Sequence, residues 1–187
     1  IWANAFEERK EIIFLSSNED NWIIRDIMEI RTATIADLAQ IAAVEAECFP
    51  AAEAATKEEF AERIKYYGNH FWLMFEDEKL IAFVDGFVTD KPDLTDEMYE
   101  RAEMHDENGA WQMIFGVNTI PAYRKHGYAG QLLQCAIEDA RKQGRKGLVL
   151  TCKEKLIAYY AKFGFVNEGI SESVHGNVIW YQMRYKF

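Results

Sequence analysis

The sequence predicts a mixed α/β (α+β) fold in which helices flank one twisted β-sheet. Two observations carry this prediction. Two apolar segments joined by a tight polar turn lie near the middle of the chain, and residues 111–187 alternate strand, helix, strand, helix and strand. Of the 187 residues, 49% are hydrophobic and 14% aromatic, which is enough for one substantial core.

The first half of the chain predicts a strand, two helices and the hairpin. Residues 29–32 read as a short strand, and Thr34 is placed to cap the helix that follows. A second helix is expected over residues 57–66. The segment "HFWLMFEDEKLIAFVDGFV" then alternates as two strands joined by a turn at residues 76–79.

Residues 1–27 are expected to lie outside the core domain, which then comprises residues 28–187. The first methionine is Met28, and "MEIRTATIADL" has the pattern of a domain start, a strand followed by a capped helix. The acidic stretch 89–109 combines turn residues with short helical potential, so we expect a surface excursion there.

The second half is more regular. "WQMIFGV" predicts a strand that Gly116 interrupts, and a glycine inside a strand often marks a bulge. Residues 129–142 carry apolar side chains at the spacing of a helix that lies on a sheet. "GLVLTC" predicts a buried strand, "KEKLIAYYAKFG" a helix that ends at Gly164, and "NVIWYQMRYK" a closing strand.

Charge is divided unevenly along the chain. Residues 1–110 hold 10 Lys and Arg against 26 Asp and Glu, a net charge of −16, whereas residues 111–187 carry +6. The total of −10 disfavours nucleic acid as the main partner. The division suits an anionic ligand on the second half and a cationic one on the first.

Composition also bears on location and on metals. No apolar run approaches the ~18 residues that a membrane span needs, and the N-terminal residues do not resemble a secretory signal. Cys48, Cys135 and Cys152 are an odd number without metal-ligand spacing, which favours reduced thiols. We expect a cytoplasmic protein with no membrane partner and no metal site.

The segment "YRKHGYAGQ", residues 123–131, places basic residues beside Gly127 and Gly130 between a strand and a helix. Such loops bind phosphate groups, because the helix N-terminus offers unpaired N–H groups and glycine lets the backbone approach an anion. The dinucleotide pattern GxGxxG and the P-loop pattern GxxxxGK[ST] are both absent. An ordinary nucleotide-binding enzyme is therefore disfavoured.

The pattern Arg124-x-x-Gly127-x-Ala129 resembles the R/Q-x-x-G-x-G/A signature of the GNAT acetyltransferases. "LTCKEKLIAYYAKFGF" at residues 150–165 is similar to the late strand and helix of that family. The resemblance spans residues 28–187 and is closest to the arylalkylamine N-acetyltransferase-like branch and its bacterial relatives. It implies a GNAT fold with a bulged, splayed central strand pair.

The resemblance also implies acetyl-CoA as co-substrate and a primary amine as acceptor. In the family, pantetheine pairs with backbone groups freed by the splayed strand, and the glycine loop holds the phosphates. The residues expected to bind the cofactor are Gly116, Val117, Asn118, Thr119, Arg124, Lys125, His126, Gly127, Tyr128, Ala129 and Gly130.

Tyr160 aligns with the catalytic tyrosine of the family and is the expected general acid, since a phenol can pass a proton to a departing thiolate. A backbone N–H within residues 116–119 is expected to polarise the thioester carbonyl. A core-packing role for Tyr160 is the alternative.

The base stays open. The animal enzymes have two histidines where this chain has Met113 and Phe115. Asp85, in the middle of a strand, is one candidate, because burial raises the pKa of a carboxylate. His105 and His175 are weaker candidates, and a water chain without a single base is equally plausible.

Together these features predict an N-acetyltransferase that moves acetyl from acetyl-CoA to a small primary amine by direct attack. A protein or peptide amine acetyltransferase and a non-catalytic acyl-CoA sensor of the same fold are the alternatives. The apolar closing strand makes a homodimer reasonable, and the sequence does not name the amine.

Overall fold

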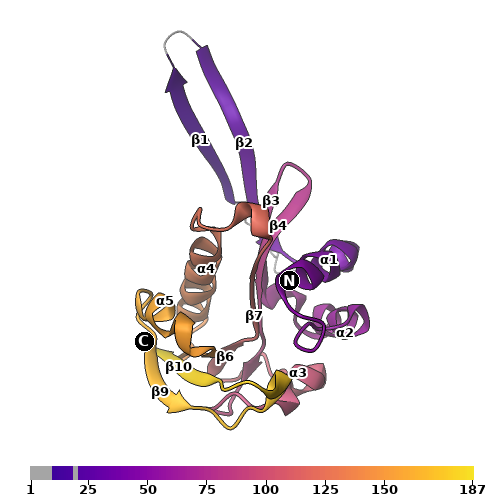
Figure 1. Cartoon of the computed structure of the whole chain (residues 1–187), viewed down its shortest axis with the longest axis vertical. Helices are drawn as coiled ribbons and strands as arrows, with labels where there is room; N and C mark the ends of the chain where they lie inside the picture. The colour runs from indigo at the N-terminus through magenta and orange to yellow at the C-terminus, as the bar shows by residue number, and fades with distance from the viewer. Residues whose placement is uncertain (1–9, 19–20) are drawn as a thin grey trace, which may run out of the picture.

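The computed structural model describes residues 10–18 and 21–187 (Figure 1). Its strands form two five-stranded sheets, in the orders β1-β2-β3-β4-β7 and β5-β6-β8-β10-β9. The strands are β1 Lys10–Asn18, β2 Asn21–Thr32, β3 Phe71–Glu76, β4 Lys79–Asp85, β5 Val88–Thr89, β6 Trp111–Ile114, β7 Gly116–Thr119, β8 Gly147–Cys152, β9 Val166–Ile170 and β10 Tyr181–Lys186. The α-helices are α1 Leu38–Cys48, α2 Lys57–Tyr67, α3 Glu97–Glu100, α4 Tyr128–Lys142 and α5 Ile157–Ala161.

The first sheet lies between helices. Both α1 and α4 contact β4, and they cover opposite faces of the sheet (Figure 1). The apolar stripe of α4, which the sequence predicts, is buried at Leu132, Leu133, Ala136, Ile137 and Ala140. The mixed α+β architecture expected from the sequence is confirmed, with the strands divided between two sheets where one was expected.

Local signals explain several boundaries. Thr34 and Asp37 form a capping box before α1, and Thr56 and Glu59 form another at the start of α2. Each box satisfies backbone N–H groups that a helix N-terminus otherwise leaves unpaired. Gly164 follows α5 with φ +96°, as the expected C-terminal glycine.

The predicted strand over residues 111–117 is divided at Phe115. Its first part, β6, pairs in parallel with β8 in the second sheet, whereas its second part, β7, pairs antiparallel with β4 in the first sheet. Gly116 is the first residue of β7. The interruption of the strand therefore lies beside this glycine, where the sequence predicted it. The break joins the two sheets and separates β7 from β8.

Two regions differ from the simplest expectation. Residues 86–110, here called the 86–110 segment, include the stretch 89–109 that was expected as a surface excursion. The segment buries Leu94, Met98 and Ala102, so it packs against the core. The strands β1 and β2 form a hairpin that projects from the other elements, and β2 pairs with β3 only through Met28–Thr32 (Figure 1). The assignment of residues 1–27 to an extension stays a prediction, and residues 1–9 and 19–20 lie outside the described ones.

Within residues 10–18 and 21–187, no helix combines the length and the apolar character that crossing a bilayer requires.

Candidate active site

A cavity of about 430 Å³ opens where β7 and β8 diverge. Gly116 and Val117 line it from β7, and Leu150, Thr151 and Cys152 line it from β8. Helices α1, α2 and α5 and the 86–110 segment supply the other walls. The cavity therefore lies at the break that Phe115 introduces, where one strand leaves its sheet for another.

Among the described strands, β7 has a partner on one edge only, where it pairs with β4. Ile120 N–H donates to the Ile81 carbonyl at 3.0 Å, and backbone groups in an antiparallel pair alternate between the two edges. The backbone N–H and C=O groups of Val117 and Thr119 therefore face the edge of β7 opposite to β4, where the described residues supply no strand. Val117 also lines the cavity. Its N–H therefore faces the open edge of β7 and has no strand partner among the described residues.

The glycine loop lies at the far end of β7, next to α4. Gly127 adopts φ +86° at the N-cap of α4, and an added Cβ there would meet nothing within 4 Å. Lys125 also has positive φ, +70°, and Arg124 Nε donates to the Thr119 carbonyl at 3.0 Å. The loop thus exposes the first N–H groups of α4 beside two cations, a site that fits a phosphate.

The residues predicted to bind the cofactor are neighbours in space, because β7, the loop and the start of α4 are continuous. Their contacts with a cofactor stay a prediction. For Gly130 the structure adds a second role, since an added Cβ would lie 2.8 Å from the ring of Phe163. A glycine there lets α4 pack closely against the segment that follows α5.

Tyr160 reaches the cavity from α5. Its side chain is 6% exposed, and burial raises the pKa of the phenol above its ordinary value, so the hydroxyl keeps its proton at neutral pH. No hydrogen bond to this hydroxyl occurs within the described part of the chain. Tyr160 packs against Tyr159 and Phe165, and it also lines the cavity beside Cys152.

Asp85 is buried at the end of β4, with 1% of its surface exposed. Burial raises the pKa of its carboxyl to about 6, although Arg63 and a backbone hydrogen bond from Gly116 oppose the increase. Arg63 Nη1 lies 3.3 Å from Asp85 Oδ2. A Cβ at residue 116 would lie 2.5 Å from Asp85 Oδ1. The glycine therefore makes room for this carboxylate.

Glu45, on α1, is a second buried carboxylate in the cavity wall, and the sequence did not identify it as a candidate. It is 6% exposed, and burial together with the nearby Asp85 charge raises its pKa to about 7. Its two oxygens accept hydrogen bonds from Ala55 N–H at 3.0 Å and Asn118 Nδ2 at 2.7 Å. Both donors are neutral. No ion pair to Glu45 occurs among the described residues.

The sequence does contain a signal for two of the buried charged residues, Glu45 on α1 and Arg63 on α2. A helix stripe at positions i, i+3, i+4 and i+7 should be apolar, yet in α1 it reads Ile41, Val44, Glu45 and Cys48. In α2 the same stripe reads Phe60, Arg63, Ile64 and Tyr67. A charged residue inside an apolar stripe is rare without a partner or a function.

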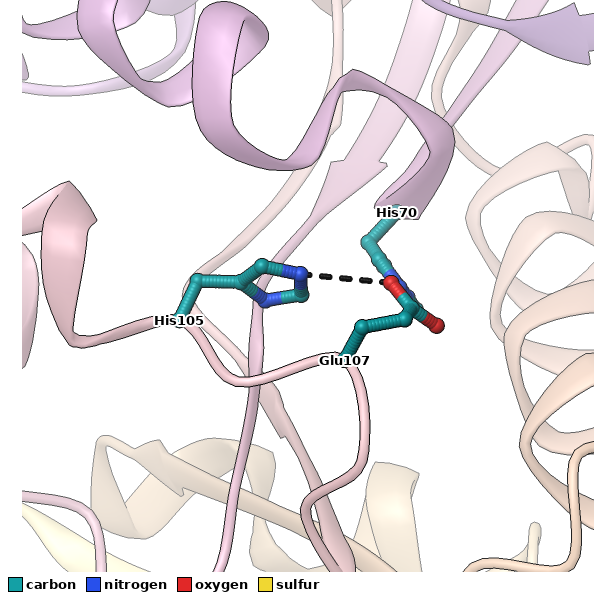
Figure 2. A group of neighbouring side chains, drawn as sticks. All are labelled: His70, His105 and Glu107. Carbon is teal, nitrogen blue, oxygen red and sulfur yellow. Dashed lines mark hydrogen bonds and ion pairs between the residues drawn. The ribbon is translucent and has the colours of Figure 1, made fainter.

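Of the two weaker base candidates, His105 and His175, the structure describes only the side chain of His105. His105 does not line the cavity. It belongs to a cluster with His70 and Glu107 that links the 86–110 segment to the connection before β3 (Figure 2). Glu107 Oε2 lies 2.9 Å from His70 Nε2 and 3.2 Å from His105 Nε2, and Arg145 binds its other oxygen at 2.8 Å.

Hydrogen bonds account for each ring nitrogen of this cluster. Gln112 Nε2 donates to two backbone carbonyls, so its oxygen accepts from His70 Nδ1 at 2.8 Å, and His70 Nε2 lies 2.9 Å from the Glu107 carboxylate. Val88 N–H donates to His105 Nδ1, which makes His105 Nε2 the protonated nitrogen. Although burial opposes it, the hydrogen bond and charge of His70 lower the pKa of Glu107 to about 2. These interactions connect the 86–110 segment to the residues before β3 and to Arg145.

The comparisons agree with this architecture. The model of the acetyltransferase (GNAT) family matches residues 38–165, more than half of the chain. The search of curated proteins found no match. Many solved structures are similar, and three illustrate the range.

The loading GNATL domain of CurA from Lyngbya majuscula is 16% identical, with a TM-score of 0.74 over 85% of this chain and 97% of that one. The ribosomal-protein-S18-alanine N-acetyltransferase of Escherichia coli is 18% identical, with a TM-score of 0.63 over 85% and 93%. The PaiA N-acetyltransferase of Thermoplasma acidophilum, solved with coenzyme A, is 19% identical, with a TM-score of 0.64 over 86% and 99%. These likenesses support the fold, and with the family match over residues 38–165 they show that the chain belongs to the GNAT acetyltransferase family.

Proposed function

We propose that this protein is an N-acetyltransferase that transfers acetyl from acetyl-CoA to a small primary amine. The observation that carries the proposal is the charge of Glu45, a buried carboxylate with a pKa raised to about 7 and no cationic partner among the described residues. It shares one cavity with Val117, whose N–H faces the open edge of β7, and with the protonated Tyr160 hydroxyl. These three groups match the needs of amine acetylation.

The chain fits acetyl-CoA at two places. The open edge of β7 offers backbone groups to an extended amide-containing arm, and the N-terminus of α4 with Arg124 and Lys125 offers N–H groups and charge to phosphates. The bare space around Gly127 lets an anion approach the backbone. Bound there, acetyl-CoA supplies an activated thioester.

Each protein group then has one task. Glu45, ionised near and above pH 7, takes a proton from the substrate ammonium or from the attacking nitrogen. Val117 N–H donates a hydrogen bond to the carbonyl oxygen as negative charge develops there. The new N–C bond replaces the C–S bond, and Tyr160 gives its proton to the leaving sulfur. Its high pKa keeps that proton available.

The charges of the cavity wall favour an amine with one ammonium group and an apolar body. Asp85 is paired with Arg63, and Glu53 is paired with Lys153 at 2.9 Å. Glu59, Asp96 and Glu100 also line the cavity, but only Glu45 and Asp85 of its carboxylates are buried. Of these two, Glu45 is the one without an ion pair among the described residues. Aromatic rings also line the cavity, at Phe49, Tyr99, Phe115, Tyr160 and Trp180.

Free-thiol release from acetyl-CoA tests the proposal directly. The panel comprises phenethylamine and tryptamine, spermidine, glucosamine, and peptides with a free N-terminus or a lysine. We expect the two monoamines to turn over fastest. Turnover of the peptides alone would favour the protein acetyltransferase alternative. Binding of coenzyme A without any turnover would favour the sensor.

A further inference from the structure

We infer that Asn118 is a positioning residue that holds Glu45 in place and favours the ionised form of its carboxylate. The inference rests on the proposed role of Glu45 as base. Asn118 lies on β7, the strand that lines the cofactor side of the cavity, whereas Glu45 lies on α1. The bond of 2.7 Å from Asn118 Nδ2 to Glu45 Oε2 is thus a side-chain link between the two sides.

The geometry of Asn118 is fixed from several directions. Its backbone pairs with Phe83 on β4, and its side chain is 1% exposed. A Cβ added at Gly116 would lie 3.5 Å from Asn118 Nδ2 and 2.5 Å from Asp85 Oδ1, so the amide and that carboxylate occupy the same side of β7. Asn118 has little freedom to turn away from Glu45.

The other end of the amide indicates a role beyond packing. Asn118 Oδ1 is buried without a hydrogen-bond partner among the described residues. A buried, unpaired carbonyl oxygen destabilises a fold, and an apolar side chain would avoid it. The amide nitrogen, by contrast, faces a carboxylate that burial and Asp85 both push toward the neutral form. A donor at this point favours the ionised form that a base requires.

The test replaces the amide by an apolar side chain of similar size, Asn118→Leu, with Asn118→Ala as a smaller second variant. A hydrogen bond to a charged group is worth about one to two pH units in the pKa of that group. We therefore expect the acidic limb of the kcat profile to move up by at least one pH unit, with kcat largely recovered on the plateau above it. A merely structural role would lower kcat at every pH and leave the limb in place.

A second readout does not need activity. The ¹³C shift of the Glu45 carboxyl, assigned by its loss in Glu45→Gln, gives the titration midpoint in the wild type and in Asn118→Leu. Thr119→Val, which removes a buried unpaired hydroxyl from the same strand, is the matched control and should leave the midpoint unchanged. If no amine is acetylated, the proposed function fails while the midpoint still decides the inference. An unchanged midpoint in both Asn118 variants would overturn it.

Discussion

The two sides of the cavity present different kinds of chemical group, backbone amides on one side and charged side chains on the other. The side proposed to bind the cofactor consists mainly of backbone groups on one continuous stretch, from β7 through the glycine loop to the start of α4; we call it the cofactor side. The side proposed to bind the amine, the amine side, consists of buried charged side chains from α1, α2 and β4, with Glu45, Arg63 and Asp85 among the lining residues. A backbone site needs glycines and a strand break, whereas a side-chain site needs burial.

This difference has energetic consequences. Backbone groups at a strand edge and a helix terminus bind an anion with little loss of stability, because they are solvated until the ligand arrives. A buried carboxylate such as Glu45 reduces stability in its charged form. Reactivity should therefore depend on the amine side, and cofactor affinity on the other side.

The largest effect is expected from Glu45→Gln. Loss of a general base lowers kcat by on the order of 10²- to 10⁴-fold, while affinity for coenzyme A should stay the same. Glu47→Gln is the matched control, since Glu47 is exposed on the same helix. Steady-state kinetics and calorimetric titration with coenzyme A measure the two quantities. An equal loss in both variants, or a parallel loss of cofactor affinity, would show that the two sides are not separable.

Tyr160→Phe should have a smaller effect on kcat, about tenfold, because a thiolate with a conjugate-acid pKa near ~8.5 can leave without full protonation. Tyr159→Phe, which alters the adjacent ring that contacts Tyr160, is the control. Thiol release at saturating acetyl-CoA is the measurement. Unimpaired turnover in Tyr160→Phe would leave this residue with a packing role only.

Charge reversal at the loop tests the other side. The double substitution Arg124→Glu and Lys125→Glu should weaken coenzyme A binding by about tenfold at low salt and less at high salt, since exposed charges are screened. The control double substitution, Lys142→Glu with Lys146→Glu, makes the same charge change at the opposite end of α4. If both double substitutions weaken coenzyme A binding equally, the loop contributes only to the overall electrostatic field of the protein.

The smallest effect concerns stability. The pKa of Glu45 is raised from 4.5 to about 7, so the native state keeps this proton while the unfolded chain loses it. The contribution of Glu45 is fully present below pH 4.5 and is lost as pH rises through 7, by at most about 3 kcal/mol.

Glu45→Gln avoids that loss, and exchange of Asn118 Nδ2 and Oδ1 by a flip of the amide in place would let Oδ1 accept from the new side chain. We expect its Tm to exceed that of the wild type at pH 8 by more than it does at pH 5. Melting curves at the two pH values measure this. An equal Tm difference at pH 5 and pH 8 would mean that ionisation of Glu45 does not cause the loss of stability.

The same contrast explains which parts of the candidate site could be predicted from the sequence. The backbone geometry of the proposed cofactor side was predictable because its signals are local, a glycine in a strand, a glycine loop and a regular helix over one stretch; cofactor binding there stays a prediction. Asp85 could be proposed because it interrupts an apolar strand. Glu45 could not be placed, because its burial depends on Ala55 and on Asn118, 73 residues further along the chain. Its only sequence signal was a charge inside the apolar stripe of α1.

The second sheet and the 86–110 segment show a similar limit. The short β5 and the edge strand β9 have weak patterns, and β9 is held mainly by its pairing with β10. The acidic composition of the 86–110 segment suggested a surface position, but its few apolar residues are the ones that pack inward. Composition alone does not identify which residues of a mostly polar segment are buried.

The pH dependence of kcat with the best amine tests the central claim most directly, measured for the wild type, Glu45→Gln and Asp85→Asn. We predict an acidic limb with an apparent midpoint near the Glu45 pKa of about 7. That limb should be absent in Glu45→Gln. In Asp85→Asn it should persist at lower pH, because removal of the Asp85 charge eases ionisation of Glu45. A limb that persists in Glu45→Gln and disappears in Asp85→Asn would contradict the account and make Asp85 the base.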